Sequence, residues 1–196
     1  MSDSETKNQP DNAETKASEE VFTGKVDLVS SDGSAFEVAK QVAAQSELVK
    51  VMLKPAQDEE EDDEDSEGEN ETKQEIPLPN VDAATLSKIV EFLNYHHHNG
   101  PSREIEKPLH SYNLCEVVDE WDANFIDIEH ERLFELIVAA NYMDIKSLLD
   151  LGCAKVATLI KGKSPEDIRR TFNIVNDFTP EEEARIREEN RWCGEG

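Results

Sequence analysis

A short motif near residue 160 has the form of a phosphate-binding loop. Gly162-Lys163-Ser164 matches the end of that motif, in which backbone amides and a lysine surround a phosphate chain. The motif also requires a glycine at position 157 and a strand before the loop, but this chain has Ala157 and apolar residues at helical spacing there. The sequence therefore predicts that one helix ends at Lys161-Gly162 and another begins at Ser164, without nucleotide binding.

Three consecutive histidines, His96-His97-His98, could suggest a metal site. Consecutive side chains on a helix point about 100° apart, so three adjacent imidazoles cannot converge on one ion. No cysteine or Asp–His cluster supplies the remaining ligands. We therefore expect no metal and no cofactor, and we interpret the histidines as a frayed, exposed helix end. His130, in an acidic helix start, is expected to lie at the surface rather than to act as a base.

The cysteines Cys115, Cys153 and Cys193 are scattered, and no two have CxxC spacing. This pattern is typical of reduced thiols, which predicts a location in the cytoplasm and nucleus. Cys115 and Cys153 are expected to be packing residues, because a free cysteine behaves as a small apolar side chain. No residue stands in a nucleophile elbow or a Gly-rich turn, so we predict that the chain is not an enzyme.

Acidic residues dominate the charge of the chain. Its 196 residues carry 45 acids against 20 bases, a formal charge of −25, and Asp58–Glu71 holds 11 of the acids and no base. Such a field repels phosphate backbones and anionic lipids, so we expect neither a nucleic-acid partner nor a membrane partner. No run of 18 apolar residues could span a bilayer, and the polar segment from Met1 to Glu20 is unlike a signal peptide.

Two segments are expected to stay solvated. Residues 1–20 contain few apolar side chains and are interpreted as a disordered tail, and residues 56–75 as an acidic insert whose like charges repel. An alternative function rests on that insert, because an acidic chaperone could bind basic proteins through it. Ser66, which is flanked by acids, is a hypothetical phosphorylation site.

The elements that would position these residues begin with a β-hairpin. Two alternating apolar runs, residues 25–29 and 35–38, flank the turn residues Ser31-Asp32-Gly33-Ser34. A helical stretch follows and closes at Lys54-Pro55. Residues 76–79 predict a short edge strand, because their prolines cannot donate to a central ladder.

The chain then becomes helical around a second insert. Asn80 or Asp82 can cap a helix that ends in the histidines, and an irregular insert is expected at residues 98–118. Beyond it, one amphipathic helix ends near Asn141, and Asp144 can cap the next.

Two further helix starts follow, at Ser164-Pro165 and Thr179-Pro180, each with a hydroxyl cap, a proline in the first turn and acids after it. The order predicts an α+β region followed by an all-α region. The apolar side chains of the all-α region must be buried against a partner or in a core of their own. They are Leu148, Leu149, Val156, Ile160, Ile168, Phe172, Ile174, Phe178 and Trp192.

Four segments carry a long and specific order of residues. They read LFELIVAANYMDI at 133–145, IKGKSPEDIR at 160–169, TFNIVNDFTPEEE at 171–183 and REENRWC at 187–193. With the hairpin turn and the PLPNV segment at 77–81, they resemble the Skp (S-phase kinase-associated) family. The resemblance covers about residues 25–193, apart from the two inserts.

The resemblance implies a fold, a role and a set of contacts. It implies a BTB/POZ domain at residues 21–143, then a C-terminal helical F-box-binding region at 144–196. The implied role is an adaptor of SCF cullin–RING ubiquitin ligases, with F-box proteins and a cullin as partners; whether the free protein is a homodimer stays open. Asn141 and Tyr142 match the family's cullin-contacting pair, and Pro165 is a hypothetical modification site. The implied F-box-facing residues are Leu149, Cys153, Val156, Ile160, Phe172, Ile174 and Trp192.

The sequence departs from short members of the family in the insert Arg103–Glu116 and in its Gly194-Glu195-Gly196 ending. Another cullin adaptor, elongin C, offers an alternative resemblance. That protein lacks an extended helical region such as the one after Gly162, so the helical starts at Ser164 and Thr179 favour the Skp family.

Overall fold

The computed structural model describes residues 22–53, 74–111 and 113–191. The predicted tail, Ser66 with nearly all of the acidic insert, and Trp192 lie outside the described residues. Within the described ranges, no helix is both long and apolar enough to cross a bilayer.

A hairpin forms the first half of the sheet. β1 (Lys25–Ser30) and β2 (Ala35–Ala39) pair antiparallel, as the alternating pattern predicts. The carboxylate of Asp32 closes the turn, because it accepts a 2.6 Å hydrogen bond from Ser30 Oγ and a 3.0 Å bond from the Ser34 amide. The Ser30 hydroxyl, followed by the groups of Ser34, lowers the pKa of Asp32 to about 2.

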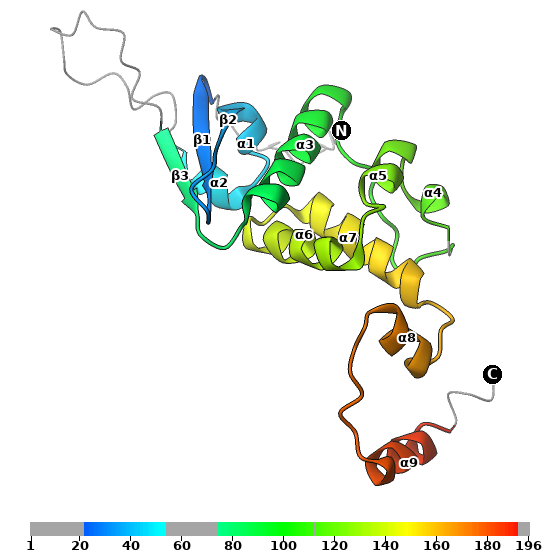
Figure 1. Ribbon diagram of the computed structural model, residues 1–196. Helices are drawn as coiled ribbons and strands as arrows, with labels where there is room; N and C mark the ends of the chain where they lie inside the picture. The colour runs from blue at the N-terminus through cyan, green and yellow to red at the C-terminus, as the bar shows by residue number, and fades with distance from the viewer. Residues whose placement is uncertain (1–21, 54–73, 112, 192–196) are drawn as a thin grey trace, which may run out of the picture.

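The third strand, β3 (Gln74–Leu78), pairs parallel to β1, so that β1 lies in the middle of the sheet. Pro77 therefore stands on an edge strand, which confirms the prediction drawn from its missing N–H. Figure 1 shows the three strands at one end of the molecule.

The helical stretch after the hairpin is two short helices, α1 (Lys40–Ala43) and α2 (Glu47–Met52). Ser46 separates them and caps α2, because its Oγ accepts a 3.2 Å hydrogen bond from the Val49 amide. The same hydroxyl donates a 2.6 Å bond to the Met143 carbonyl. This buried contact joins the front of the chain to the turn at Met143, within the segment 133–145 of the family resemblance.

The next helix, α3 (Ala83–Asn99), begins at Asp82, whose carboxylate accepts from the amides of Ala84 and Thr85. The prediction of a frayed, exposed histidine end was wrong for His96, which is only 8% exposed. The helix continues past His96, and the imidazole contacts the buried carboxylate of Asp122 beyond the second insert. The spacing of residues around His96 does not indicate this distant partner.

The second insert is only partly irregular. Residues 114–118 were expected to be irregular, but the insert contains the one-turn helix α4 (Leu114–Val117), and α5 (Glu120–Phe125) follows it. Leu114 and Val117 are buried in the core. Burial of these two apolar side chains explains why the end of the insert is ordered.

The helices α6 (His130–Tyr142) and α7 (Lys146–Ile160) form the largest helix pair. They approach closely at Gly152, where an added Cβ would lie 2.5 Å from Ile137 Cγ1. The prediction that Asp144 caps α7 was wrong. Asp144 has a left-handed backbone (φ 50°) in the sharp turn between the helices, and α7 starts without a side-chain cap.

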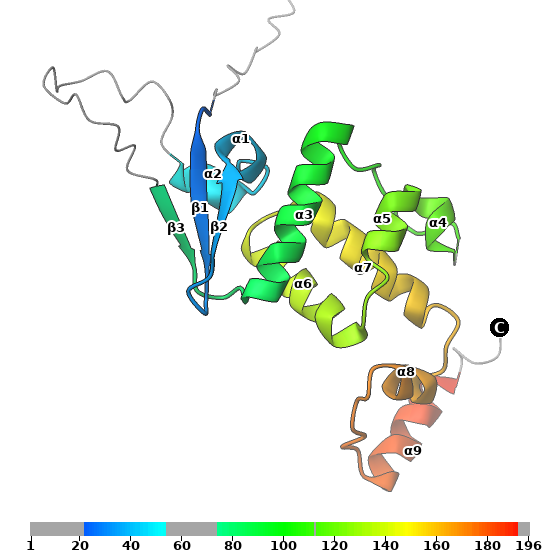
Figure 2. The same ribbon diagram turned by 45° about the horizontal axis from the view of Figure 1, so that its top comes forward.

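Two short helices complete the chain, α8 (Pro165–Thr171) and α9 (Pro180–Glu189). Their predicted starts are confirmed, because Ser164 accepts from an amide of α8 and Thr179 forms a capping box with Glu182. Neither helix has a buried residue. Figures 1 and 2 both show them projecting from the body beyond the end of α7.

The core lies between the sheet and the helices α3, α5, α6 and α7. Its largest fully buried side chains come from both the front and the back of the chain, so the sheet shares one core with α3 and with the pair of α6 and α7. They are Phe92, Leu28, Ile76, Leu78, Leu86, Ile89, Leu93, Ile126, Leu133, Met143, Ile145 and Leu148.

Candidate protein-binding surfaces

Four of the residues predicted to face a partner form a stripe along α7. Their spacing of four, three and four residues places them within about 60° of one another around the helix. Cys153 and Ile160 are exposed, the other two are half-buried, and Leu148 and Leu151 on the opposite face are buried. We name Leu149, Cys153, Val156 and Ile160 the α7 stripe.

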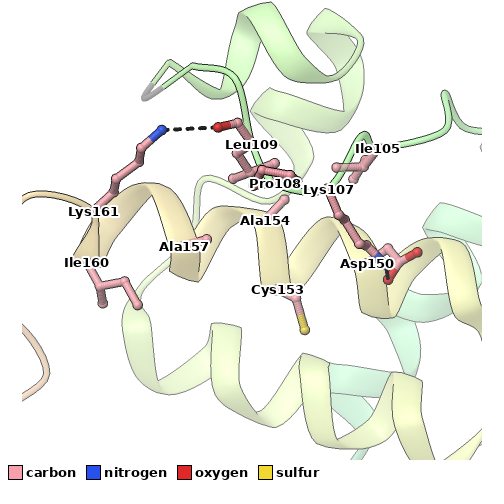
Figure 3. Close-up of a pocket in the computed structure, with 10 residues that line it drawn as sticks. All are labelled: Ile105, Lys107, Pro108, Leu109, Asp150, Cys153, Ala154, Ala157, Ile160 and Lys161. Carbon is pink, nitrogen blue, oxygen red and sulfur yellow. Dashed lines mark hydrogen bonds and ion pairs between the residues drawn. The ribbon is translucent and has the colours of Figure 1, made fainter.

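An apolar groove of about 670 Å³ adjoins this stripe. One wall is the loop of residues 105–109, and the floor is the surface of α7 at Ala154 and Ala157. Figure 3 shows the loop on one side of α7 and the side chains of Cys153 and Ile160 on the other. The groove is thus continuous with half of the stripe. We name it the α7 groove.

Two lysine contacts hold the loop against α7. Lys107 Nζ lies 2.7 Å from Asp150 Oδ1, and Lys161 Nζ donates to the Leu109 carbonyl at 3.1 Å. The hydrogen bond to Asp150 raises the pKa of Lys107. One lysine belongs to the loop and the other directly follows α7, so the wall is held at its middle and at its last residue (Figure 3).

Sequence reasoning missed the loop as part of the site. Ile105 and Leu109 were placed in an insert and given no role, although both are half-buried and pack against the core. Two apolar side chains four residues apart in an otherwise charged insert were the available signal. Nothing in the sequence connects them with a helix that begins about forty residues later.

The predicted residues of the C-terminal helices lie apart from the α7 groove. Phe172 packs on α6, with its ring centroid 5.4 Å from those of His130 and Phe134. Ile174 is 54% exposed. Trp192 falls outside the described residues, so the structure brings together the α7 stripe but not the whole predicted set.

The predicted cullin-facing pair ends α6. Asn141 is exposed, and Tyr142 is half-buried with its ring against the core. The turn behind them is fixed by two backbone hydrogen bonds, from the Asp144 amide to the Asn141 carbonyl at 3.2 Å and from the Ile145 amide to the Ala140 carbonyl at 2.9 Å. The pair is thus presented on a rigid corner rather than on a loop.

The remaining candidates have local roles. Pro165 is exposed in the first turn of α8, where its missing amide costs nothing. Gly162, from the phosphate-loop motif, has φ 75° and ends α7, as predicted from the helix-stop interpretation. Within the described residues, no group of three or more His, Cys, Asp or Glu side chains could hold a metal ion.

His96 is part of a buried polar cluster instead. Its Nδ1 donates to the Gly100 carbonyl at 3.0 Å, because a carbonyl can only accept, and its Nε2 lies 2.8 Å from Asp122 Oδ1. Ser102 Oγ is 3.1 Å from the same Nε2. Burial raises the pKa of Asp122, and the hydrogen bond with His96 opposes that rise. The cluster fixes the start of the loop that leads to the α7 groove.

Comparison with known proteins identifies the family. Two Skp1-family profiles match, described as the tetramerisation domain over residues 24–98 and the dimerisation domain over residues 146–193. The S-phase kinase-associated protein 1 homolog of Tetrahymena thermophila is 54% identical over 172 residues, which are 87% of this chain and 95% of that protein.

Two fungal proteins are similar over comparable lengths. The E3 ubiquitin ligase complex SCF subunit sconC of Arthroderma otae is 47% identical over 171 residues, or 87% of this chain and 95% of that protein. The sconC subunit of Aspergillus flavus is 46% identical over 166 residues, or 85% and 94%. The predicted resemblance and the predicted POZ fold with C-terminal helices are confirmed by these matches. The chain belongs to the Skp1 family.

Proposed function

We propose that this protein is an adaptor subunit of an SCF-type E3 ubiquitin ligase and bridges F-box substrate receptors to a cullin. The observation that carries the proposal is the α7 stripe, an apolar helix face that the chain leaves partly exposed while it buries the opposite face. Apolar anchors at an exposed position favour a buried interface centre in a complex. Two similar proteins are named as SCF subunits of an E3 ubiquitin ligase complex, which supports the assignment.

In this proposal the protein performs no chemical step. A scaffold that holds a substrate receptor and a ubiquitin-charged enzyme on one assembly makes transfer between them effectively intramolecular. The contribution of this subunit is to hold two surfaces at a fixed separation. The α7 stripe would face the F-box protein, and the corner at Asn141 and Tyr142 would face the cullin.

The C-terminal helices would complete the F-box contact. Ile174, Val175 and Phe178 between α8 and α9 are 54%, 84% and 44% exposed, so this segment presents apolar area that a partner could cover. The alternative function as an acidic chaperone depends on Asp58–Glu71, which falls outside the described residues. From its thiol pattern, we further propose that the protein works in the cytoplasm and nucleus.

A capture experiment tests the proposal with two variants that affect separate surfaces. Val156→Glu with Ile160→Glu places charge in the α7 stripe, and Asn141→Ala with Tyr142→Ala alters the corner. Each tagged variant is expressed in cells, and the captured proteins are identified by mass spectrometry. The stripe variant is expected to lose F-box proteins and keep the cullin, and the corner variant is expected to do the reverse.

A matched control adds the same charge elsewhere. Ser87→Glu with His97→Glu introduces two acids at exposed positions of α3, outside both the α7 stripe and the corner at Asn141 and Tyr142. This control is expected to capture both classes of partner. If wild type captures neither class, or if basic proteins dominate every sample, the adaptor function is wrong and the chaperone function is favoured.

A further inference from the structure

We propose that residues 105–109 are a second contact surface for the F-box protein, as the fixed wall of the α7 groove. This inference rests on the proposed function and adds to it, because the insert was given no binding role. The wall would contact apolar side chains of the partner segment that lies along the α7 stripe. The partner is thus identified by its chemistry, as an apolar face of an F-box domain.

The shape of the groove supports this occupant. The small side chains of Ala154 and Ala157 form a floor between two apolar edges, the loop wall on one side and Cys153 with Ile160 on the other. Its volume of about 670 Å³ is within the range of pockets that bury large apolar groups. A partner helix could place a side chain on this floor and still contact the stripe.

Continuity with the stripe is the argument for an F-box protein rather than another ligand. Cys153 and Ile160 belong to both surfaces, so a protein that covers the stripe must also cover the edge of the α7 groove. The four-three-four spacing of the stripe is repeated one residue later along the chain by four groove residues. They are Asp150, Ala154, Ala157 and Lys161. The two surfaces are therefore adjacent faces of one helix.

The wall is fixed before a partner binds. The contacts of Lys107 with Asp150 and of Lys161 with the Leu109 carbonyl hold the loop at two points along α7. The half-buried side chains of Ile105 and Leu109 pack against the core below it. A wall that is already ordered loses little conformational entropy on binding, which favours affinity.

The inference predicts a selective loss of affinity. Ile105→Ala with Leu109→Ala would remove the apolar surface of the wall while leaving the α7 stripe intact. Truncation of two contacting apolar side chains is expected to weaken binding of the F-box partner about tenfold to a hundredfold. Binding of the cullin should stay within about twofold, because Asn141 and Tyr142 do not line the α7 groove and neither is changed.

The experiment uses the full-length protein and one purified F-box receptor that wild type captures, with titration calorimetry for each variant and for the cullin. Glu106→Ala is the matched control, because this exposed residue belongs to the same loop but does not line the groove. Lys107→Met is a second test variant, which removes the contact with Asp150 at the middle of the wall without removing apolar surface. It keeps the inference testable if the double alanine variant fails to fold, as judged by circular dichroism.

Each outcome decides between the two proposals. A tenfold or greater loss for Ile105→Ala with Leu109→Ala, or a smaller loss of about twofold to fivefold for Lys107→Met, with normal binding by Glu106→Ala, supports the inference. Equal affinity of wild type and wall variants overturns the inference but leaves the adaptor function intact. If wild type binds no F-box receptor, the adaptor function itself fails. If the wall variants bind more tightly, or only change the oligomeric state, the groove holds a segment of this chain or a second copy, and the inference is wrong.

Discussion

The close approach of α6 and α7 makes Gly152→Ala a sensitive test of the structure. An alanine Cβ at this buried position would lie 2.5 Å from Ile137 Cγ1 and 3.2 Å from Ile137 Cδ1. Carbon atoms prefer a separation of about 3.5–4.0 Å, so the first contact is at least about 1 Å too short. The two helices would have to separate, or Ile137 would have to leave its rotamer.

Two opposing effects determine the size of the change. Alanine is favoured over glycine inside a helix by about 1 kcal/mol. Overpacking of a close contact costs about 1–3 kcal/mol. We expect a net loss of about 1 kcal/mol, with an upper limit near 2 kcal/mol, because the contact is with a side chain that is only half-buried and can partly adjust.

A double-mutant cycle separates these effects. Ile137→Ala removes both Cγ1 and Cδ1, and with them the close contact. In that background, Gly152→Ala should raise the free energy of unfolding by about 1 kcal/mol, because only the preference of a helix for alanine over glycine remains. Urea denaturation of wild type, the two single variants and the double variant measures the four free energies of unfolding. If Gly152→Ala alone raises the stability by about 1 kcal/mol, the helices do not approach as described.

Three other changes have defined outcomes. Asp122→Ala should lower the free energy of unfolding by about 3 kcal/mol, because it leaves His96 buried without its carboxylate, whereas Asp127→Ala at the surface should cost under about 1 kcal/mol in the same urea titrations. Asp32 has a folded-state pKa of about 2, against an ordinary value of 3.8, chiefly because the Ser30 hydroxyl donates to its carboxylate. Its stabilisation is therefore present above pH about 4 and lost as the pH falls through about 2, so the difference from Asp32→Asn should shrink in that window; a constant difference would contradict this. Thr179→Ala should speed amide exchange in α9, through loss of a cap worth about 1 kcal/mol, and leave exchange in α3 unchanged; slower or equal exchange in α9 would show that the capping box is not stabilising.

Features set by neighbouring residues could be predicted from the sequence. Asp32 and Gly33 determine the hairpin turn, and the hydroxyl-proline pairs at Ser164 and Thr179 determine two helix starts. The missing amide of Pro77 placed β3 at an edge. Each prediction was correct because the relevant physics acts within about four residues. The α7 stripe also follows from local spacing, since helix geometry alone puts its four side chains on one face.

Features that depend on distant contacts could not be predicted. His96 was expected at an exposed helix end because its neighbours in sequence are polar, but its partner Asp122 is 26 residues away. Asp144 was expected to cap α7 from its residue type, yet the sharp turn after α6 requires a left-handed backbone there. Aspartate tolerates that conformation better than most residues, so the residue type was informative for a different reason.

The wall of the α7 groove shows the same limit at the candidate site. Its residues lie in an insert that composition alone describes as charged and irregular, and their position depends on Lys107 and Lys161 finding partners about forty to fifty residues away. Because this insert is fixed against a partner-facing helix, we expect it to affect which partner binds, for a physical reason that the resemblance to a family does not supply.

The helix pair also constrains how an adaptor of this shape could work. The corner at Asn141 and Tyr142 precedes α7, whose 15 residues span about 22 Å, and the α7 stripe runs along this helix from Leu149 in its first turn to Ile160 at its end. Gly152 lets α6 pack closely along the same helix, which resists bending between the surfaces. A partner at one surface can change the other only by moving α7 relative to α6, and the close contact with Ile137 opposes that movement. The structure thus favours a rigid spacer over an allosteric relay.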